Sequence, residues 1–112
     1  FRAKVAELEI DLMATEFTEL RSLAAASTGG APGPESSILK LKGTEIQQRI
    51  QKLTVEAGGM YSAAWGGSAG PSFARSGMSG YLSSRAYTIY GGASEVQKDV
   101  IAKNVLGIKT SK

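Results

Sequence analysis

The segment 90–95 carries the residue types that most favour a bound group. Gly91 and Gly92 follow an aromatic residue, and paired glycines let the backbone approach a ligand closely or adopt a positive φ. Ser94 and Glu95 then open a helix, and a helix N-terminus presents oriented N–H groups that suit a phosphate or another anion. The same pattern also occurs at ordinary turns into helices, so the residues alone leave both interpretations open.

The composition excludes several other kinds of chemistry. The 112 residues contain neither Cys nor His, which excludes disulfides, thiolate and imidazole metal ligands, and histidine-based triads. We therefore expect no metal site. The net charge is only +3 and the basic residues are spread along the chain, so nucleic acid is not an expected partner. No apolar run approaches the roughly 18 residues of a membrane-spanning helix.

Hydrophobic spacing predicts a long helix from Phe1 to about Ala26, because most of the steps between its apolar residues are three or four. The chain begins as if in the middle of a helix, so we expect its upstream part to be missing. The composition of residues 27–34, rich in Gly, Ser and Pro, predicts a loop. The apolar residues of this first helix are Val5, Leu8, Leu12, Phe17, Leu20 and Leu23.

A second helix is predicted from Pro34-Glu35 to Gly58-Gly59, because Pro suits the first helical position and Gly the end. Gly43 interrupts its apolar stripe and marks a candidate for a close helix crossing. The apolar residues of this stripe are Ile38, Leu41, Ile46, Ile50 and Leu53.

Residues 60–80 are dominated by Gly, Ser and Ala, so they can bury little apolar surface and predict a long loop. This loop is either a mobile connector or is pinned at Tyr61, Trp65 and Phe73. A short helix or turn is expected over residues 80–87. A last helix is predicted from Ser94 to about Gly107, with Ser94 and Gln97 forming a capping box. The sum is an all-α antiparallel helical bundle in one domain.

The run from Tyr87 to Gly107, YTIYGGASEVQKDVIAKNVLG, resembles the C-terminal signature of acyl-CoA dehydrogenases. In that family, an aromatic–Gly–Gly or aromatic–Glu–Gly turn leads into Thr-Ser-Glu-Ile-Gln and a helix. Pro34-Glu35 opening a helix that closes at Gly58-Gly59 adds to the resemblance. It covers residues 1–112 as the C-terminal helical bundle domain of a longer protein, whose upstream helical and β domains are absent here.

The resemblance implies an FAD-dependent enzyme that oxidises an acyl-CoA thioester to the trans-2-enoyl-CoA and passes electrons to an electron-transfer flavoprotein. It also implies a homo- or hetero-tetramer, in the bacterial cytoplasm or the mitochondrial matrix. We expect the fragment alone to be inactive. By resemblance, the acyl site is lined by Tyr90, Gly91 and Gly92, and FAD is contacted by Ser94, Glu95, Gly58 and Gly59.

Three departures from the family pattern narrow these expectations. Gly91 occupies the position of the catalytic Glu of some members, so this chain is expected to hold no catalytic residue. In isovaleryl- and long-chain-type branches, which share the Gly-Gly turn, that Glu comes from an earlier helix. Val55 replaces a frequent Gln and Ala93 the usual Thr, and the loop over residues 60–80 is longer than usual. Two alternatives stay open: a non-catalytic subunit of a hetero-oligomeric acyl-CoA dehydrogenase, and a free-standing helical interaction module.

Overall fold

The computed structural model describes residues 1–29, 33–64 and 68–109 and contains helices and turns but no strand among them. Two long helices come first, α1 (Arg2–Ser27) and α2 (Glu35–Gly58). They are followed by the short helices α3 (Ser72–Arg75) and α4 (Gly77–Ser83), and by α5 (Ser94–Asn104). Two 3-10 helices lie between them, η1 (Gly59–Ala63) and η2 (Ser84–Thr88). The all-α antiparallel prediction is confirmed.

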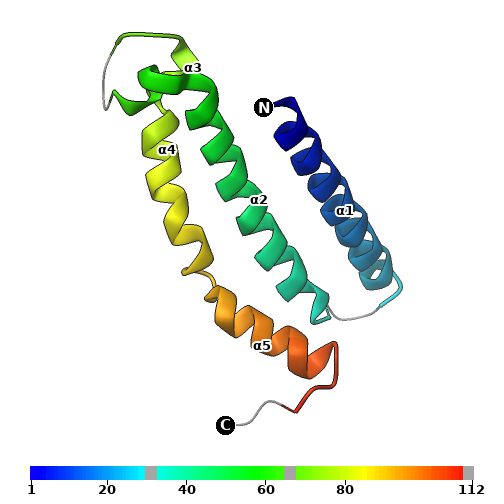
Figure 1. The fold of residues 1–112 in the computed structure, drawn as a ribbon. Coiled ribbons are helices and arrows are strands. Elements are labelled where there is room, and N and C mark those ends of the chain that lie inside the picture. The colour runs from blue at the N-terminus through cyan, green and yellow to red at the C-terminus, as the bar shows by residue number, and fades with distance from the viewer. Residues whose placement is uncertain (30–32, 65–67, 110–112) are drawn as a thin grey trace.

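Helix α2 is the centre of the arrangement. Figure 1 shows α1 antiparallel to α2 on one side and α4 antiparallel to it on the other, with α5 continuing past the start of α2. Helix α2 contacts every other helix, whereas α1 packs mainly on α2. The molecule is correspondingly elongated, 51 × 33 × 24 Å.

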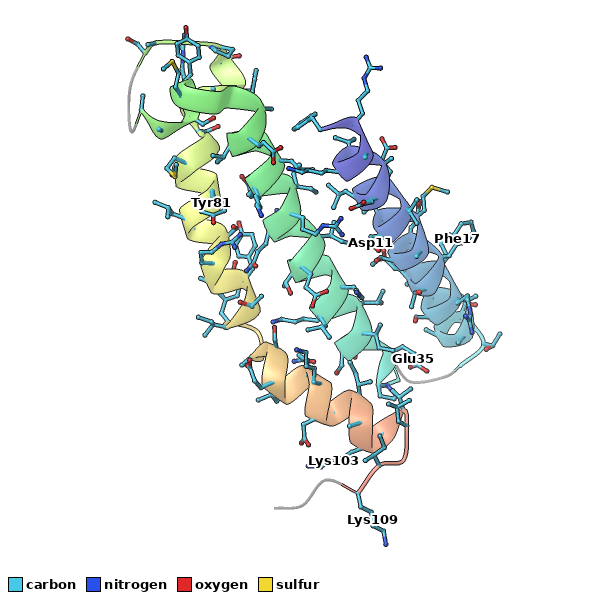
Figure 2. The ribbon with its side chains drawn as sticks, viewed as in Figure 1. Asp11, Phe17, Glu35, Tyr81, Lys103 and Lys109 are labelled. Carbon is cyan, nitrogen blue, oxygen red and sulfur yellow. The ribbon has the colours of Figure 1, made fainter. Side chains whose placement is uncertain are left out.

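The predicted apolar stripe of α1 is largely exposed in this chain. Leu8 is buried, but Phe17 keeps 63% and Leu23 59% of its surface exposed. In Figure 2, Asp11 lies on the side of α1 that faces α2, and Phe17 lies on the opposite side. A single neighbouring helix covers only one side of α1, which leaves the other side open.

Ion pairs join the facing sides of α1 and α2. Lys4 Nζ lies 2.6 Å from Glu56 Oε1, and Arg49 pairs with Asp11 and lies 3.8 Å from Glu7 Oε2. The pKa of Glu56 is lowered, chiefly because Lys4 donates a hydrogen bond to its carboxylate. Polar contacts therefore define this helix pair as much as apolar burial does.

The prediction of a long loop over residues 60–80 is wrong for most of the described part. This stretch holds most of η1, all of α3 and the start of α4, which begins at Gly77 and not near residue 80. Ser62 and Ala74 are 1% and 0% exposed, and Gly77 is buried. These small side chains bury little area but let the segments approach closely, which a count of apolar residues cannot detect.

The expected anchors of this stretch are only partly observed. Tyr61 and Phe73 are both about half exposed, and Trp65 lies outside the described residues. A Cβ added to Gly70 would lie 2.6 Å from the Tyr61 ring, so Tyr61 packs directly against the Gly70 backbone. Gly43, in contrast, has no atom within 4 Å of an added Cβ, so it does not mark a close helix crossing.

Candidate functional site

The turn between η2 and α5 brings the predicted residues 90–95 together at the surface. Gly91 and Gly92 have φ of +67° and +99°, a conformation that L side chains rarely adopt. Gly91 and Tyr90 are exposed and Gly92 is half-buried. The Tyr90 ring meets that of Tyr87 edge-on, with centroids 5.6 Å apart. The glycines thus adopt the positive φ that the sequence allowed.

Helix α5 begins without a side-chain cap, so the predicted capping box is wrong. The N-cap residue is Ala93, whose side chain carries no acceptor, and Ser94 is already the first helical residue. The Ser94 hydroxyl donates to the Thr88 carbonyl at 3.4 Å. The Gln97 side chain lies against Gly92, where an added Cβ would collide with it. The N-cap lies one residue earlier than predicted, because the turn ends at Ala93 and Ser94 already belongs to the helix.

This uncapped start leaves the first turn of α5 available to a ligand. The first backbone bond of the helix runs from Gln97 N to Ala93 O, at 3.0 Å, and no side chain in the described part of the chain caps the helix start. The N–H groups of such a first turn, with the positive end of the helix dipole, suit an anion. Glu95 is exposed in this first turn and works against anion binding if its side chain approaches.

Two side chains of α2 hold the segment that leads into this turn. Lys40 Nζ donates to Tyr87 O at 3.1 Å and to Gly92 O at 2.6 Å. Gln48 Nε2 donates to Ser84 O at 3.0 Å. Sequence analysis missed both residues. The only signal for Lys40 is its place between Leu39 and Leu41, where a charged residue on an otherwise apolar stretch of helix needs a polar partner.

A groove lies beside the turn, between α2 and the two tyrosines. Gly43 forms part of it because no side chain fills the space above its backbone. One wall is therefore aromatic and the opposite wall is small or polar. The groove is lined by Gly43, Thr44, Gln47, Tyr87 and Tyr90.

Gly58 and Gly59 lie far from this turn, near the other end of α2. The helix rises about 1.5 Å per residue, which places Gly58 about 27 Å along the axis from Lys40. Gly58 is buried, and an added Cβ would lie 2.9 Å from Ala74 Cβ. Gly59 is exposed with φ of +53° and open space around it. Gly59 is thus the more accessible of the two, although its N–H already bonds to Val55 O and Glu56 O, and Gly58 serves the packing of α3 and η1.

No group of three or more acidic residues able to hold a metal ion occurs in the part of the chain that the structure describes. Within the same ranges, no helix is both long enough and apolar enough to cross a membrane.

Comparison with known proteins gives one match. The family described as "Acyl-CoA dehydrogenase, C-terminal domain" matches residues 1–106. No curated protein and no solved structure matches the chain.

Proposed function

The chain belongs to the acyl-CoA dehydrogenase family, as its C-terminal domain, and we propose that the full-length protein oxidises an acyl-CoA thioester to the trans-2-enoyl-CoA with FAD. In this proposal the domain supplies acyl-site contacts, part of the FAD site and an oligomer interface. The isolated chain is inactive.

The exposed glycine turn before α5 carries this proposal. Its backbone has no side chain at Gly91 or Gly92, and Tyr90 stands beside them with 58% of its surface exposed. An extended thioester group can therefore approach the main chain of the turn closely. Family membership gives this geometry its chemical meaning, since the same turn in an unrelated protein would be an ordinary connection.

The residues present fit FAD in two separate places. The uncapped first turn of α5 offers Ser94 and Glu95 amides to an anionic or polar group. Gly59 is exposed, with no atom within 4 Å of an added Cβ, although its N–H bonds to Val55 O and Glu56 O. When bound, FAD would accept a hydride from the acyl Cβ. Because about 27 Å of α2 separates the two places, we propose that Gly59 and the turn serve FAD molecules of different subunits.

The catalytic base is proposed to come from outside this chain. Removal of the Cα proton needs a carboxylate on the side of the substrate opposite the flavin. Gly91 supplies none, and Glu95 is exposed at the start of α5 rather than held over the turn. The expected source is a glutamate on an upstream helix.

The absence of a carboxylate at Gly91 also favours a second candidate function. A non-catalytic subunit of a hetero-oligomeric acyl-CoA dehydrogenase needs no base and could still complete a shared FAD site. In either case, the exposed apolar residues of α1 support an oligomer, because they are unprotected in the single chain. The electron acceptor is proposed to be an electron-transfer flavoprotein or a similar carrier.

The test uses the purified full-length protein. We expect a yellow protein that releases FAD on denaturation and oxidises acyl-CoA with an artificial electron acceptor. Bound FAD without turnover, with activity regained on adding a co-expressed family partner, would favour the non-catalytic subunit. A colourless protein that gains no flavin on reconstitution would contradict both candidates.

A further inference from the structure

Lys40 stands out among the charged residues because its ammonium group bonds only to backbone carbonyls. It is half-buried on α2, and its Nζ donates to Tyr87 O at 3.1 Å and Gly92 O at 2.6 Å. Lys42, two residues along, is exposed and pairs with the Glu45 carboxylate instead. An ammonium group removed from water needs such partners, and charge-assisted hydrogen bonds are stronger than neutral ones.

The two carbonyls that Lys40 joins lie on either side of the candidate site. Tyr87 belongs to the last turn of η2, where carbonyls lack helical partners and a lysine can satisfy them. Gly92 ends the glycine pair. One ammonium group bound to both therefore fixes the separation of the ends of the stretch that contains Tyr90 and Gly91.

Two other side chains make polar contacts near this turn, and neither bonds to its residues 89–93. Gln48 acts on the preceding helix η2, through Ser84 O and Thr88 Oγ1. Ser94 Oγ donates to Thr88 O across the same turn, but at the long distance of 3.4 Å and without a bond to residues 89–93. Among the described residues, Lys40 is the one side chain that hydrogen-bonds to residues 89–93. Glycines at positive φ lose much conformational freedom on ordering, so their conformation depends on restraints from outside the turn.

We infer that Lys40 is a positioning residue that holds the Tyr90–Gly91–Gly92 turn in its ligand-facing conformation. Its link to substrate binding rests on the function proposed above, whereas its link to the conformation of the turn does not. Lys40 touches no reacting group in this inference; it acts through the backbone of the turn.

Hydrogen–deuterium exchange on the full-length protein tests the conformational part directly. The amides of Ile89 and Tyr90 both donate to Ala86 O, at 2.9 and 3.1 Å, and report on the order of the turn. For Lys40→Met we expect their exchange to rise roughly tenfold, as loss of hydrogen bonds to a charged group would cause. Peptides from α1 serve as the internal reference and should exchange as before.

Two further variants make the test specific. Lys40→Arg keeps the charge and the donors and should restore most of the protection. Lys42→Met removes an exposed lysine of the same helix and should leave exchange unchanged. Unchanged protection of Ile89 and Tyr90 in Lys40→Met would overturn the inference. If that variant unfolds throughout, Lys40→Gln replaces it: local deprotection supports the inference, and parental exchange overturns it.

Steady-state kinetics then separate this inference from the proposed function. If the parent protein oxidises acyl-CoA, Lys40→Met should raise KM roughly tenfold with a smaller change in kcat, because a displaced turn weakens substrate contacts. Unchanged KM together with faster exchange would overturn only the link to substrate binding. A parent protein without flavin or turnover would contradict the proposed function, and the exchange result would still decide the conformational role of Lys40.

Discussion

Lys4 Nζ lies 2.6 Å from Glu56 Oε1, so a salt bridge joins the first turn of α1 to the last turn of α2. The two residues are far apart in sequence, and both side chains remain partly exposed. This bridge and the pairs of Arg49 with Glu7 and Asp11 follow the α1–α2 contact along its length. They join the facing sides of the two helices at the last turn of α2 and near its middle.

The salt bridge predicts a pH dependence of stability. The pKa of Glu56 lies below its ordinary value of 4.5, mainly because of the hydrogen bond from Lys4. A carboxyl whose pKa is lower in the folded state stabilises the fold above its unfolded pKa, and this contribution disappears as the pH falls through the folded pKa. We therefore expect Glu56→Gln to unfold at a lower temperature than the parent near pH 7, with the difference vanishing once the pH has fallen below the folded-state pKa of Glu56.

The same pair predicts a salt dependence, since exposed charges are screened. The unfolding curves of the parent and of Glu56→Gln should differ at low ionic strength and converge at high ionic strength.

Lys42, whose bridge to Glu45 lies within α2, provides the control for the pH prediction: Lys42→Met should leave the pH dependence of the parent intact. A difference between parent and Glu56→Gln that persists at low pH would contradict the assignment.

Gly92 and Gly43 should respond in opposite ways to alanine. Gly92 has φ of +99° and no room for a Cβ beside Gln97, so Gly92→Ala should destabilise the protein by about 1–3 kcal/mol. Gly43 lies inside α2 with open space above it, so Gly43→Ala should stabilise by about 0.5–1 kcal/mol. Denaturant unfolding measures both, and equal effects would refute the assigned backbone conformations.

Removal of the Ser62 hydroxyl group is expected to stabilise the fold. Its hydroxyl is buried and has no hydrogen-bond partner among the residues that the structure describes, and an unsatisfied buried polar group costs about 1–3 kcal/mol. Ser62→Ala removes the hydroxyl and keeps the Cβ that fills the space near Gly58 and Gly77. We expect a gain of about 1 kcal/mol in the free energy of unfolding. A loss on denaturant unfolding would show that the hydroxyl has a partner in solution.

Ala93 predicts a helix cap that can be restored. It is the N-cap residue of α5, with φ of −57° and ψ of 149°, and Ser at such a position is preferred over Ala by about 1 kcal/mol. Ala93→Ser should therefore raise the thermal unfolding midpoint. Ser94→Ala should change it little, because the Ser94 bond to Thr88 is long, at 3.4 Å. A clear fall in the midpoint for Ser94→Ala, with no rise for Ala93→Ser, would show that Ser94 is the cap.

The exposed face of α1 predicts self-association of the 112-residue chain at micromolar concentration. Phe17 is 63% exposed, whereas Leu8 is 9% exposed. Phe17→Ser should weaken association in sedimentation and change folding stability by no more than about 0.5 kcal/mol. Leu8→Ala should instead cost about 2 kcal/mol of stability. A monomeric parent chain would contradict the prediction. The other large apolar residues exposed on α1 are Ile10, Leu12, Met13, Leu20 and Leu23.

The helices could be predicted from the sequence because their signals are local. The start of α2 at Glu35 and its end at Gly58 follow from Pro, Gly and apolar spacing. Helix α5 begins at Ser94 as predicted, although the capping box that placed it there does not form. The positive φ of Gly91 and Gly92 was likewise anticipated from residue type.

The features that were missed depend on contacts between distant segments. Ser62 and Ala74 are buried because small residues meet Gly58 closely, and residue hydrophobicity does not encode that fit. The capping box failed by one position, since the end of the turn depends on how residues 90–93 fold. Lys40 of α2 donates a hydrogen bond to the carbonyl of Gly92 in the turn, and no local sequence pattern predicts such a distant partner.

The separation of the turn and Gly59 along α2 constrains how this protein can change in evolution. A deletion of one residue between Lys40 and Gly58 would rotate one end of α2 by about 100° relative to the other. The lysine would then point away from the turn, or the glycine away from η1 and α3. Insertions and deletions should therefore be rare within α2, whereas point substitutions on its exposed side should be freely accepted.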